Sequence, residues 1–407
     1  MASCKSPYEP REDSTLLERY VREYAKGAVL DMGTGSGIQA IAAVQSSKVD
    51  SVVGADVLKS AVDYCKKCIK HRKIKEFLVS DLFEGIKKDK ELRNKKFKKF
   101  DTIIFNPPYL PDELKVKDLT LEGGKKGYEA IERFLSEVNE FLNPDGIILI
   151  VFSSLTKKEK VDEFIRNNLL EFELLEKQHY FFEDLHVYKI WSSELLKRLE
   201  AQGIKNVKYF AKGKRGLVFT ANYRGKKIAV KIDNPESKAA MRMENEAKFL
   251  KLLNKEGIGP KLLLHENNFL AYGFVEGVNI FQFLSSLTNN KNNKKIIIKI
   301  VEKIMKQLYV MDKLRINKQE MSHPTKHILI NKKYEPVLID FERCKYTLKP
   351  GNVTQFCDFL TSDHVSKILF TKSIPIKKDE LINAARFYKR NQNNKTYKKI
   401  IKLIENG

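Results

Sequence analysis

The sequence contains no apolar run near the roughly 18 residues that a membrane-spanning helix requires. Its beginning, MASCKSPYEPRED, carries acidic residues where a secretory signal peptide needs a hydrophobic stretch. We therefore expect a cytoplasmic protein. Its 407 residues, 42% of them apolar, are enough for two globular domains, and we see no internal repeat.

Cysteine is scarce, with five residues in the whole chain. An odd, small number argues against a disulfide framework, so we expect reduced thiols. Cys65 and Cys68 form a CxxC followed by His71, but the segment SAVDYCKKCIKHRK reads as a helix and lacks a second ligand pair at zinc-finger spacing. Buried helix packing is the favoured interpretation over zinc binding.

Acidic residues are few relative to basic ones. The chain has 75 Lys and Arg but 52 Asp and Glu, which gives a net charge of +23. Such an excess favours contact with polyanions such as RNA or the ribosome. The lysines are spread along the chain, however, so a generally solvated basic surface is the stronger interpretation.

Residues 1–190 alternate strand-like and helix-like segments, which predicts a Rossmann-like α/β fold with a doubly wound, mostly parallel sheet. The expected strands are GAVLDM, SVVGADV, EFLVSDLF, FDTIIF, GIILIVFSS, EFELLEKQHYF and DLHVYKIW. Residues 191–206 contain SSELLKRLEAQG, a polar helix suited to a linker.

Residues 207–407 have a different character. The segment 207–233 alternates as an antiparallel hairpin does, and helical periodicity dominates afterwards. We expect a small β lobe followed by a helical lobe. The polar run NNKNNKK at 289–295 is expected to be a mobile loop.

The first candidate site is a glycine-rich turn between a strand and a helix, formed by Asp31, Gly33, Gly35 and Gly37. Glycine lets backbone N–H groups approach a ligand closely, because it has no Cβ and tolerates positive φ. The segment GTGSG departs from the GxGxxG of dinucleotide enzymes and alone fits several ligands.

Acidic residues end the next two expected strands. Asp56 lies 23 positions after Gly33, where a carboxylate can accept hydrogen bonds from both hydroxyls of a ribose. Asp81, followed by Leu82, ends the next strand and is expected to reach an adenine amino group.

Asn106, Pro107, Pro108 and Tyr109 follow the strand FDTIIF. The two prolines fix the backbone so that Asn106 is a rigid acceptor, and Tyr109 offers a flat face to a planar group. Accepting the N–H protons of an amide or exocyclic amine, through Asn106 and the Pro107 carbonyl, localises the nitrogen lone pair for attack on a methyl sulfonium. The tetrad therefore predicts methyl transfer to a planar nitrogen.

Together, YEPREDSTLL, LDMGTGSG, GADV, SDLFEG, FNPPYLP and EGGKKGYEAIERFL resemble the HemK-type glutamine methyltransferases that modify peptide-chain release factors. About 29 residues precede the glycine turn, which is similar to the short archaeal and eukaryotic branch. The resemblance implies S-adenosylmethionine as cofactor, a release factor as substrate, and a small zinc-binding activator protein that pairs with the sheet edge. An acidic N-cap cluster at Glu9, Glu12 and Asp13 stays an alternative for the opening segment.

The second half has the ordered set of a kinase-like fold. Lys231 on a strand fits the lysine that contacts ATP phosphates, and Glu246 fits its helical partner, with Glu244 as the competing choice. Asp340 in VLIDFE fits the magnesium-binding aspartate, with Glu342 where a glycine is usual. The expected phosphate loop is 211–219, and the lobe connection is 274–277.

This half resembles the small atypical kinases of the RIO and KEOPS-complex type, in particular an archaeal group of serine/threonine kinases. In kinases, a metal-binding Asn lies 13 residues before the metal Asp and the catalytic Asp lies five before that Asn. Those positions hold His327 and Ser322 here. Because serine cannot accept a proton as aspartate does, Glu320 or His323 is the substitute base, and Lys326 a phosphate contact.

We therefore expect a bifunctional fusion of a glutamine methyltransferase with a protein-kinase-like, bilobal α+β domain that binds ATP and magnesium. Atypical kinase and nucleotide-binding pseudokinase stay open for that domain. The alternative for the whole chain is an RNA or DNA amino-methyltransferase with the basic second half as a binding module.

Overall fold

The computed structural model describes residues 9–89, 98–109, 126–180, 182–213, 216–233 and 240–406. The chain divides into two compact units, Met1–Tyr209 with Ala221–Arg224, and Phe210–Thr220 with Gly225–Gly407. Each unit has its own core. The boundaries 190 and 207 stay a prediction.

The first unit contains a seven-stranded sheet of order β3-β2-β1-β4-β5-β7-β6. Strands β1 to β5 run parallel, and β7 pairs antiparallel with both β5 and β6. The mostly parallel sheet expected from the sequence is present. The strands are β1 (Gly27–Met32), β2 (Val49–Asp56), β3 (Ile74–Val79), β4 (Phe100–Phe105), β5 (Leu142–Ser153), β6 (Leu170–Tyr180) and β7 (Glu183–Ser192).

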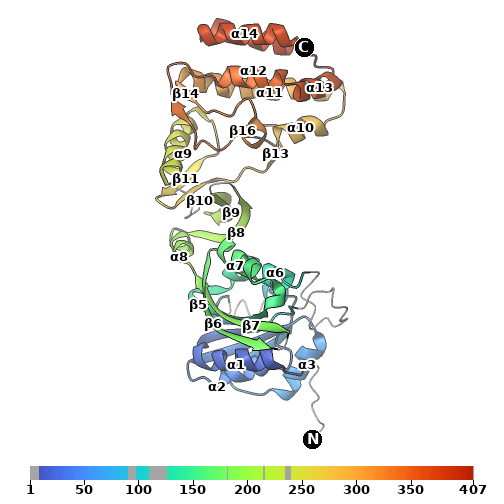
Figure 1. Ribbon diagram of the computed structural model, residues 1–407, viewed down its shortest axis with the longest axis vertical. Coiled ribbons are helices and arrows are strands. Elements are labelled where there is room, and N and C mark those ends of the chain that lie inside the picture. Colours follow the sequence, from blue (N-terminus) through green and yellow to red (C-terminus); the bar gives the residue numbers. More distant parts are fainter. Residues whose placement is uncertain are drawn as a thin grey trace. The chain divides into compact units, whose positions relative to one another are not determined.

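Helices cover both faces of this sheet, as doubly wound folds require. One core cluster joins the sheet to α1, α2 and α3, and Phe105 of β4 packs on Phe134 of α6 with ring centroids 4.4 Å apart. Figure 1 shows α1 and α2 on one side and α6 and α7 on the other. The helices are α1 (Glu12–Tyr24), α2 (Ile38–Gln45), α3 (Lys59–Cys68), α4 (Glu84–Lys88), α6 (Glu129–Glu137), α7 (Lys158–Asn167) and α8 (Glu194–Ala201).

A five-stranded sheet of order β11-β12-β10-β9-β8 follows, with the antiparallel pairings β10–β12 and β11–β12. The expected hairpin over 207–233 is thus part of a larger sheet, because β12 and β11 come from the chain beyond α9. The strands are β8 (Ile204–Lys212), β9 (Gly216–Tyr223), β10 (Lys226–Asp233), β11 (Leu262–Glu266) and β12 (Phe269–Gly273).

Helices and short strands make up the rest of the second unit, in the order expected from the sequence. Their core is one large apolar cluster. The helices are α9 (Ala240–Leu253), α10 (Ile280–Ser286), α11 (Lys291–Lys313), α12 (Asn352–Thr361), α13 (Asp363–Thr371), α14 (Lys378–Arg390) and α15 (Asn394–Glu405), and the strands are β13 (Gly277–Asn279), β14 (Ile316–Asn317), β15 (Ile328–Asn331), β16 (Pro336–Leu338) and β17 (Lys345–Tyr346).

A buried carboxylate fastens three of these helices. Asp312 of α11 accepts hydrogen bonds from the backbone N–H groups of Asn352 and Val353 and from the Tyr388 hydroxyl. Because α12 begins at Asn352 and α14 holds Tyr388, one side chain satisfies a helix N-terminus and crosslinks the bundle.

The expectation of a loop at 289–295 is wrong. Helix α11 begins at Lys291, and the Asn290 side chain caps it by accepting a 2.8 Å hydrogen bond from the Asn293 N–H. Asparagine is among the best N-cap residues, so a polar, low-complexity run supplies a helix start here.

Three cysteines, Cys65, Cys344 and Cys357, are free and buried, in line with reduced thiols, but that expectation is wrong for Cys68, which is disulfide-bonded. Cys65 lies in α3 and its thiol donates to the Gly35 carbonyl across 3.5 Å.

Among the described helices, none combines the length and the apolar character that crossing a membrane requires.

Candidate functional site

The glycine turn follows β1 directly. Gly33, Gly35 and Gly37 all have positive φ, of 69°, 51° and 78°. The Gly33 N–H donates to the Ala55 carbonyl across 2.8 Å, which ties the turn to β2. The φ of Gly37 favours glycine where α2 begins, and a Cβ there would lie 2.1 Å from Cδ1 of Ile69, which would have to move. The glycines therefore have the positive φ expected of them, and the binding of a ligand at this turn stays a prediction.

Asp31 lies under this turn and is 1% exposed. Its Oδ2 accepts hydrogen bonds from the Thr34 hydroxyl across 2.6 Å and from the Ala40 N–H across 3.1 Å. Burial outweighs these bonds and raises the pKa of the Asp31 carboxyl to about 7.

Asp56, at the end of β2, faces the same turn. Its Oδ2 accepts from the Gly35 N–H across 2.8 Å and its Oδ1 from the Leu58 N–H across 2.9 Å. Asp81 follows β3 and forms a 2.8 Å ion pair with Arg133, while Leu82 has a φ of 45°. Sequence reasoning missed Arg133, because it lies 52 residues further on.

The register of the sheet brings the glycine turn and the Asn106 segment together. Met32 of β1 pairs with Phe105 of β4, so Gly33 and Asn106 leave neighbouring strands at the same edge. A Cβ on Gly33 would lie 3.6 Å from the Asn106 carbonyl oxygen. Topology thus assembles residues that lie more than 70 positions apart.

Asn106 is held by α1. Its Nδ2 donates to Oδ2 of Asp13 and to Oγ of Ser14, each across 3.2 Å, and the Tyr109 hydroxyl donates to the same Asp13 oxygen across 3.2 Å. In the described part of the chain, Oδ1 of Asn106 is buried without a hydrogen-bond partner. An orphaned acceptor of this kind costs free energy unless a ligand donates to it.

The acidic residues of the opening segment do begin a helix, since Glu12 and Asp13 lie in the first turn of α1. Asp13 nevertheless does more than interact with a helix end, because it contacts both polar side chains of the tetrad. Pro107 follows Asn106, whereas residues 110–125, with most of the expected EGGKKG segment, lie outside the described residues.

A second cluster lies in the second unit around Lys231 of β10. Its Nζ is 2.7 Å from Oε2 of Glu246, 3.2 Å from Oε2 of Glu342 and 3.4 Å from Oδ1 of Asp340. Burial opposes the charge of Lys231, but the carboxylates of Glu246 and Asp340 outweigh it and raise its pKa. The structure brings Lys231, Glu246 and Asp340 together, and Glu244 is not in this cluster.

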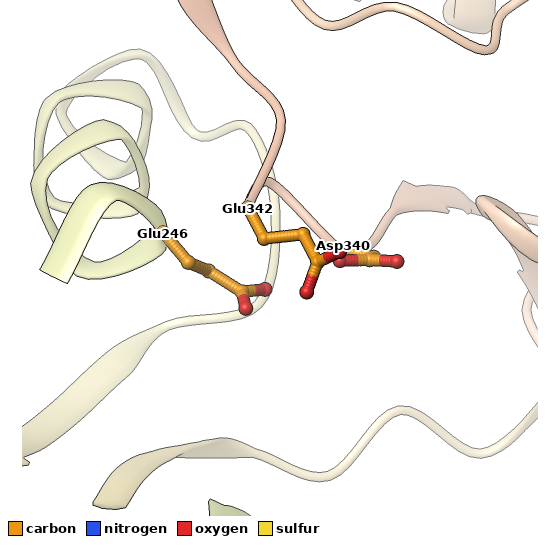
Figure 2. Close-up of side chains that lie close together, drawn as sticks. All are labelled: Glu246, Asp340 and Glu342. Carbon is orange, nitrogen blue, oxygen red and sulfur yellow. The ribbon is translucent and has the colours of Figure 1, made fainter. Parts of the chain in front are cut away.

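Glu246, Asp340 and Glu342 each offer a carboxylate oxygen, and these oxygens lie within 4.8 Å of one another (Figure 2). Glu246 comes from α9, and the other two residues follow β16. Three carboxylates that gather their oxygens in one place suit a divalent cation with oxygen ligands. Glu342 was not expected as a ligand, although its place beside Asp340 signals it.

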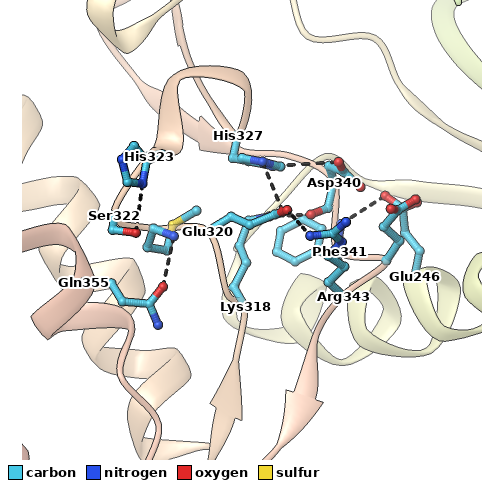
Figure 3. Close-up of polar contacts among 12 residues, drawn as sticks. Glu246, Lys318, Glu320, Ser322, His323, His327, Asp340, Phe341, Arg343 and Gln355 are labelled. Atoms are coloured by element: carbon cyan, nitrogen blue, oxygen red, sulfur yellow. Dashed lines mark hydrogen bonds and ion pairs between the residues drawn. The ribbon is translucent and has the colours of Figure 1, made fainter. Parts of the chain in front are cut away.

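A chain of charged side chains continues from Asp340 (Figure 3). Nδ1 of His327 lies 3.7 Å from Oδ2 of Asp340, and its Nε2 lies 3.2 Å from Oε2 of Glu320, which pairs with Arg343 across 2.5 Å. Burial and the Lys318 charge lower the pKa of His327. Neutral imidazole is the form that binds metals.

Lys318 was missed by the sequence reasoning. It is 1% exposed, and its Nζ donates to the backbone carbonyl of Asp340, which has a φ of 62°. Ser322 contacts His323 instead, with 3.2 Å between Oγ and Nδ1. Of the two candidate bases, Glu320 and not His323 belongs to the chain of charged side chains that leads to Asp340. Lys326 is exposed. Lys214 and Arg215 of the expected phosphate loop lie outside the described residues.

The seven-stranded sheet, with its glycine turn and Asn106 at one edge, defines a class I methyltransferase fold. The Methyltransferase small domain family matches residues 11–182. A putative protein N5-glutamine methyltransferase of Methanocaldococcus jannaschii is 32% identical over 190 residues, which cover 45% of this chain and 91% of that protein. The chain belongs to the protein N5-glutamine methyltransferase family, and is an enzyme of that family.

Other relatives match a shorter part. A release factor glutamine methyltransferase of Rhodopirellula baltica is 34% identical over 140 residues, and this chain spans 45% of its length. Among solved structures, the Mtq2-Trm112 complex of E. cuniculi, described as responsible for methylation of the eRF1 translation termination factor, matches with a TM-score of 0.36 and 24% identity. That match covers 46% of this chain and 98% of the other.

Proposed function

We propose that residues 1–190 transfer a methyl group from S-adenosylmethionine to the side-chain amide nitrogen of a glutamine, in the GGQ loop of a peptide-chain release factor. The observation that carries this proposal is Oδ1 of Asn106, which is buried and has no hydrogen-bond partner in the described residues. A glutamine side chain has two N–H groups to donate, one of which can satisfy this oxygen.

The residues around the turn fit the cofactor. Gly33, Gly35 and Gly37 have no Cβ and would let the cofactor approach the backbone of the turn closely, and Asp56 would present a carboxylate to a ribose. Asp81 and Leu82 would border the adenine. S-adenosylmethionine supplies an electrophilic methyl group when bound. Asn106 and the Pro107 carbonyl accept from the substrate amide, and Tyr109 holds its plane.

Relatives support a protein substrate but name two kinds. Several are named release factor glutamine methyltransferases, and others ribosomal protein uL3 glutamine methyltransferases. We favour the release factor because the sequence resembles the short branch of that group, and we infer a small zinc-binding activator protein as a partner at the sheet edge. Contact with the ribosome through the basic surface fits the same setting.

The test uses the full chain with labelled S-adenosylmethionine and a release factor, with and without such an activator. Mass spectrometry should find one added methyl group on the GGQ glutamine, and a release factor with that glutamine replaced by alanine should stay unlabelled. Label on total RNA and none on the release factor would instead support the amino-methyltransferase alternative.

We further propose that the second unit is a kinase-like domain that binds ATP and magnesium. The argument is the set of Lys231, Glu246 and Asp340, which are distant in sequence and adjacent in space. Lys231 would contact phosphates, while Asp340, with His327 or Glu342, would hold magnesium. Glu320 would accept a proton if phosphate is transferred, because serine at 322 cannot.

Magnesium-dependent ATP binding, measured by calorimetry, should be lost in both Lys231→Ala and Asp340→Ala. Lys227→Ala is a matched control, since Lys227 lies on the same strand and is exposed. Unchanged affinity in both site variants would remove the kinase-like assignment and leave the methyltransferase proposal intact.

A further inference from the structure

A pocket separate from the Lys231 cluster lies between α9 and β11, which are adjacent in Figure 1. Its volume is about 920 Å³, within the size range of ligand sites in proteins. One wall is a single face of α9 and the turn after it, with Glu244, Lys248, Lys251 and Lys255 at spacings of four, three and four residues. Glu246 points from a different face of that helix.

The rim of this pocket is basic. Lys248, Lys251, Lys255 and Lys261 line it and are all exposed, whereas Glu244 is its one acid. Across the described residues, no ion pair joins Lys251, Lys255 or Lys261 to a carboxylate, although many other surface lysines of this chain have one. The rim thus holds uncompensated positive charge and favours an anionic partner.

The floor is apolar. Ala247 is buried, and Leu262, Leu263 and Leu264 are half-buried in the opposite wall. The lining holds no Phe, Tyr or Trp, and its one aromatic ring is the imidazole of His265. Single-stranded RNA is usually held by several aromatic side chains on which successive bases stack, so one imidazole makes RNA the weaker candidate for this surface. Leucine side chains of a partner fit the floor better.

Strand β11, which supplies that wall, is the edge strand of its five-stranded sheet. An edge strand can accept an extended peptide through backbone hydrogen bonds. The pairing of β11 with β12 is irregular between Leu262 and Leu264, and three successive leucines of β11 line the pocket. The pocket combines a backbone edge, an apolar floor and a cationic rim.

We propose that this pocket between α9 and β11 docks an acidic peptide segment of a partner protein, with leucine-like side chains between its carboxylates. The lysines of the rim pair with the carboxylates, and the apolar side chains cover Leu262, Leu263 and Leu264. This assignment does not depend on phosphate transfer or on the methylation substrate.

The test measures binding of a fluorescent 12-residue peptide, three repeats of Glu-Leu-Glu-Ser, to the full chain. The variant Lys251→Glu with Lys255→Glu should weaken binding by at least about tenfold, because it reverses the charge of the rim. Lys261→Glu, on the opposite wall, should weaken it in the same direction. Circular dichroism checks that each variant is folded.

The matched control is Lys291→Glu with Lys295→Glu, which has the same charge change and spacing on the exposed start of α11. It should leave binding within about twofold of the wild type. A peptide with serine for leucine should bind more weakly than the parent peptide.

Three results would overturn the proposal. Equal weakening in both double variants would mean that the total charge of the protein, rather than this pocket, attracts the peptide. If the serine peptide binds as tightly as the parent peptide, the apolar floor does not contribute to binding. Failure of the peptide to bind, together with selective loss of a 12-nucleotide oligouridylate in Lys251→Glu with Lys255→Glu, would make the surface an RNA site.

Discussion

Asp13 holds the side-chain amide of Asn106 and so orients its oxygen, Oδ1. The amide nitrogen of Asn106 donates to Oδ2 of Asp13 across 3.2 Å, which fixes the amide plane and orients Oδ1 away from the carboxylate. That Oδ1 is buried and unpartnered among the described residues. The proposed acceptor is therefore oriented before any substrate binds.

Asn106→Ala should lower kcat for methyl transfer by about 10²-fold or more, since it removes a preorganised acceptor. The affinity for S-adenosylmethionine, measured by calorimetry, should change little. Asn139→Ala is the matched control, because Asn139 also has a buried Oδ1 to which no described residue donates, but its Nδ2 donates to the Asn168 carbonyl away from this site. Equal losses in both variants would count against a direct role for Asn106.

Asp13→Ala should lower kcat by roughly tenfold with little effect on cofactor affinity, because Asp13 accepts hydrogen bonds from Asn106 and Tyr109 and we expect it to act by positioning them. Asp13→Asn should recover much of the loss, since an amide oxygen still accepts from both groups. The exposed neighbour Glu12→Ala serves as control. If the asparagine variant recovers nothing, the hydrogen bonds are not the reason for the effect.

Asp31 should make the first unit less stable as pH rises. Its folded pKa is about 7, above the ordinary value of 3.8, so the folded state holds a proton that the unfolded state has released between those values. Stability is lost as pH rises from about 4 to about 7, by up to about 4 kcal/mol. Asp31→Asn should therefore be stabilised relative to wild type at pH 8, with a smaller difference at pH 5.

Thermal melts of wild type and Asp31→Asn at several pH values measure this difference. Comparing the two proteins cancels the contributions of other carboxylates, because all of those are shared. A difference in melting temperature that is the same at every pH would show that Asp31 does not titrate in this range.

Glu342→Gln should weaken magnesium-dependent ATP binding by about tenfold or more, because it removes one charged oxygen ligand from the carboxylate cluster. ATP binding without magnesium should be unaffected or slightly stronger, since a negative charge near the phosphates is gone. A magnesium titration at fixed ATP measures the effect, with the exposed Glu335→Gln as control. An unchanged magnesium midpoint would leave Asp340 and His327 as the ligands.

The sequence alone determined the order of the elements in the first unit, and it supplied the candidate residues of both sites. Parallel strands buried on both faces leave continuous apolar runs, and glycine turns and double prolines restrict the backbone within a few residues, so these signals are local. The prediction of a loop at 289–295 was wrong because it too used only local composition. An asparagine cap at the start of a helix and a polar loop have nearly the same composition.

Only the tertiary structure decided which side chains meet. Asp13 reaches Asn106 across 93 positions, Arg133 reaches Asp81 across 52, and Lys231 gathers Asp340 and Glu342 across more than 100. Strand register and helix packing determine these contacts, and neither can be predicted from a short segment of the sequence. Whether the Oδ1 of Asn106 has a hydrogen-bond partner in the described residues likewise depends on the tertiary structure. The tetrad therefore predicted Asn106 as the acceptor, but it could not predict that Asp13 orients it.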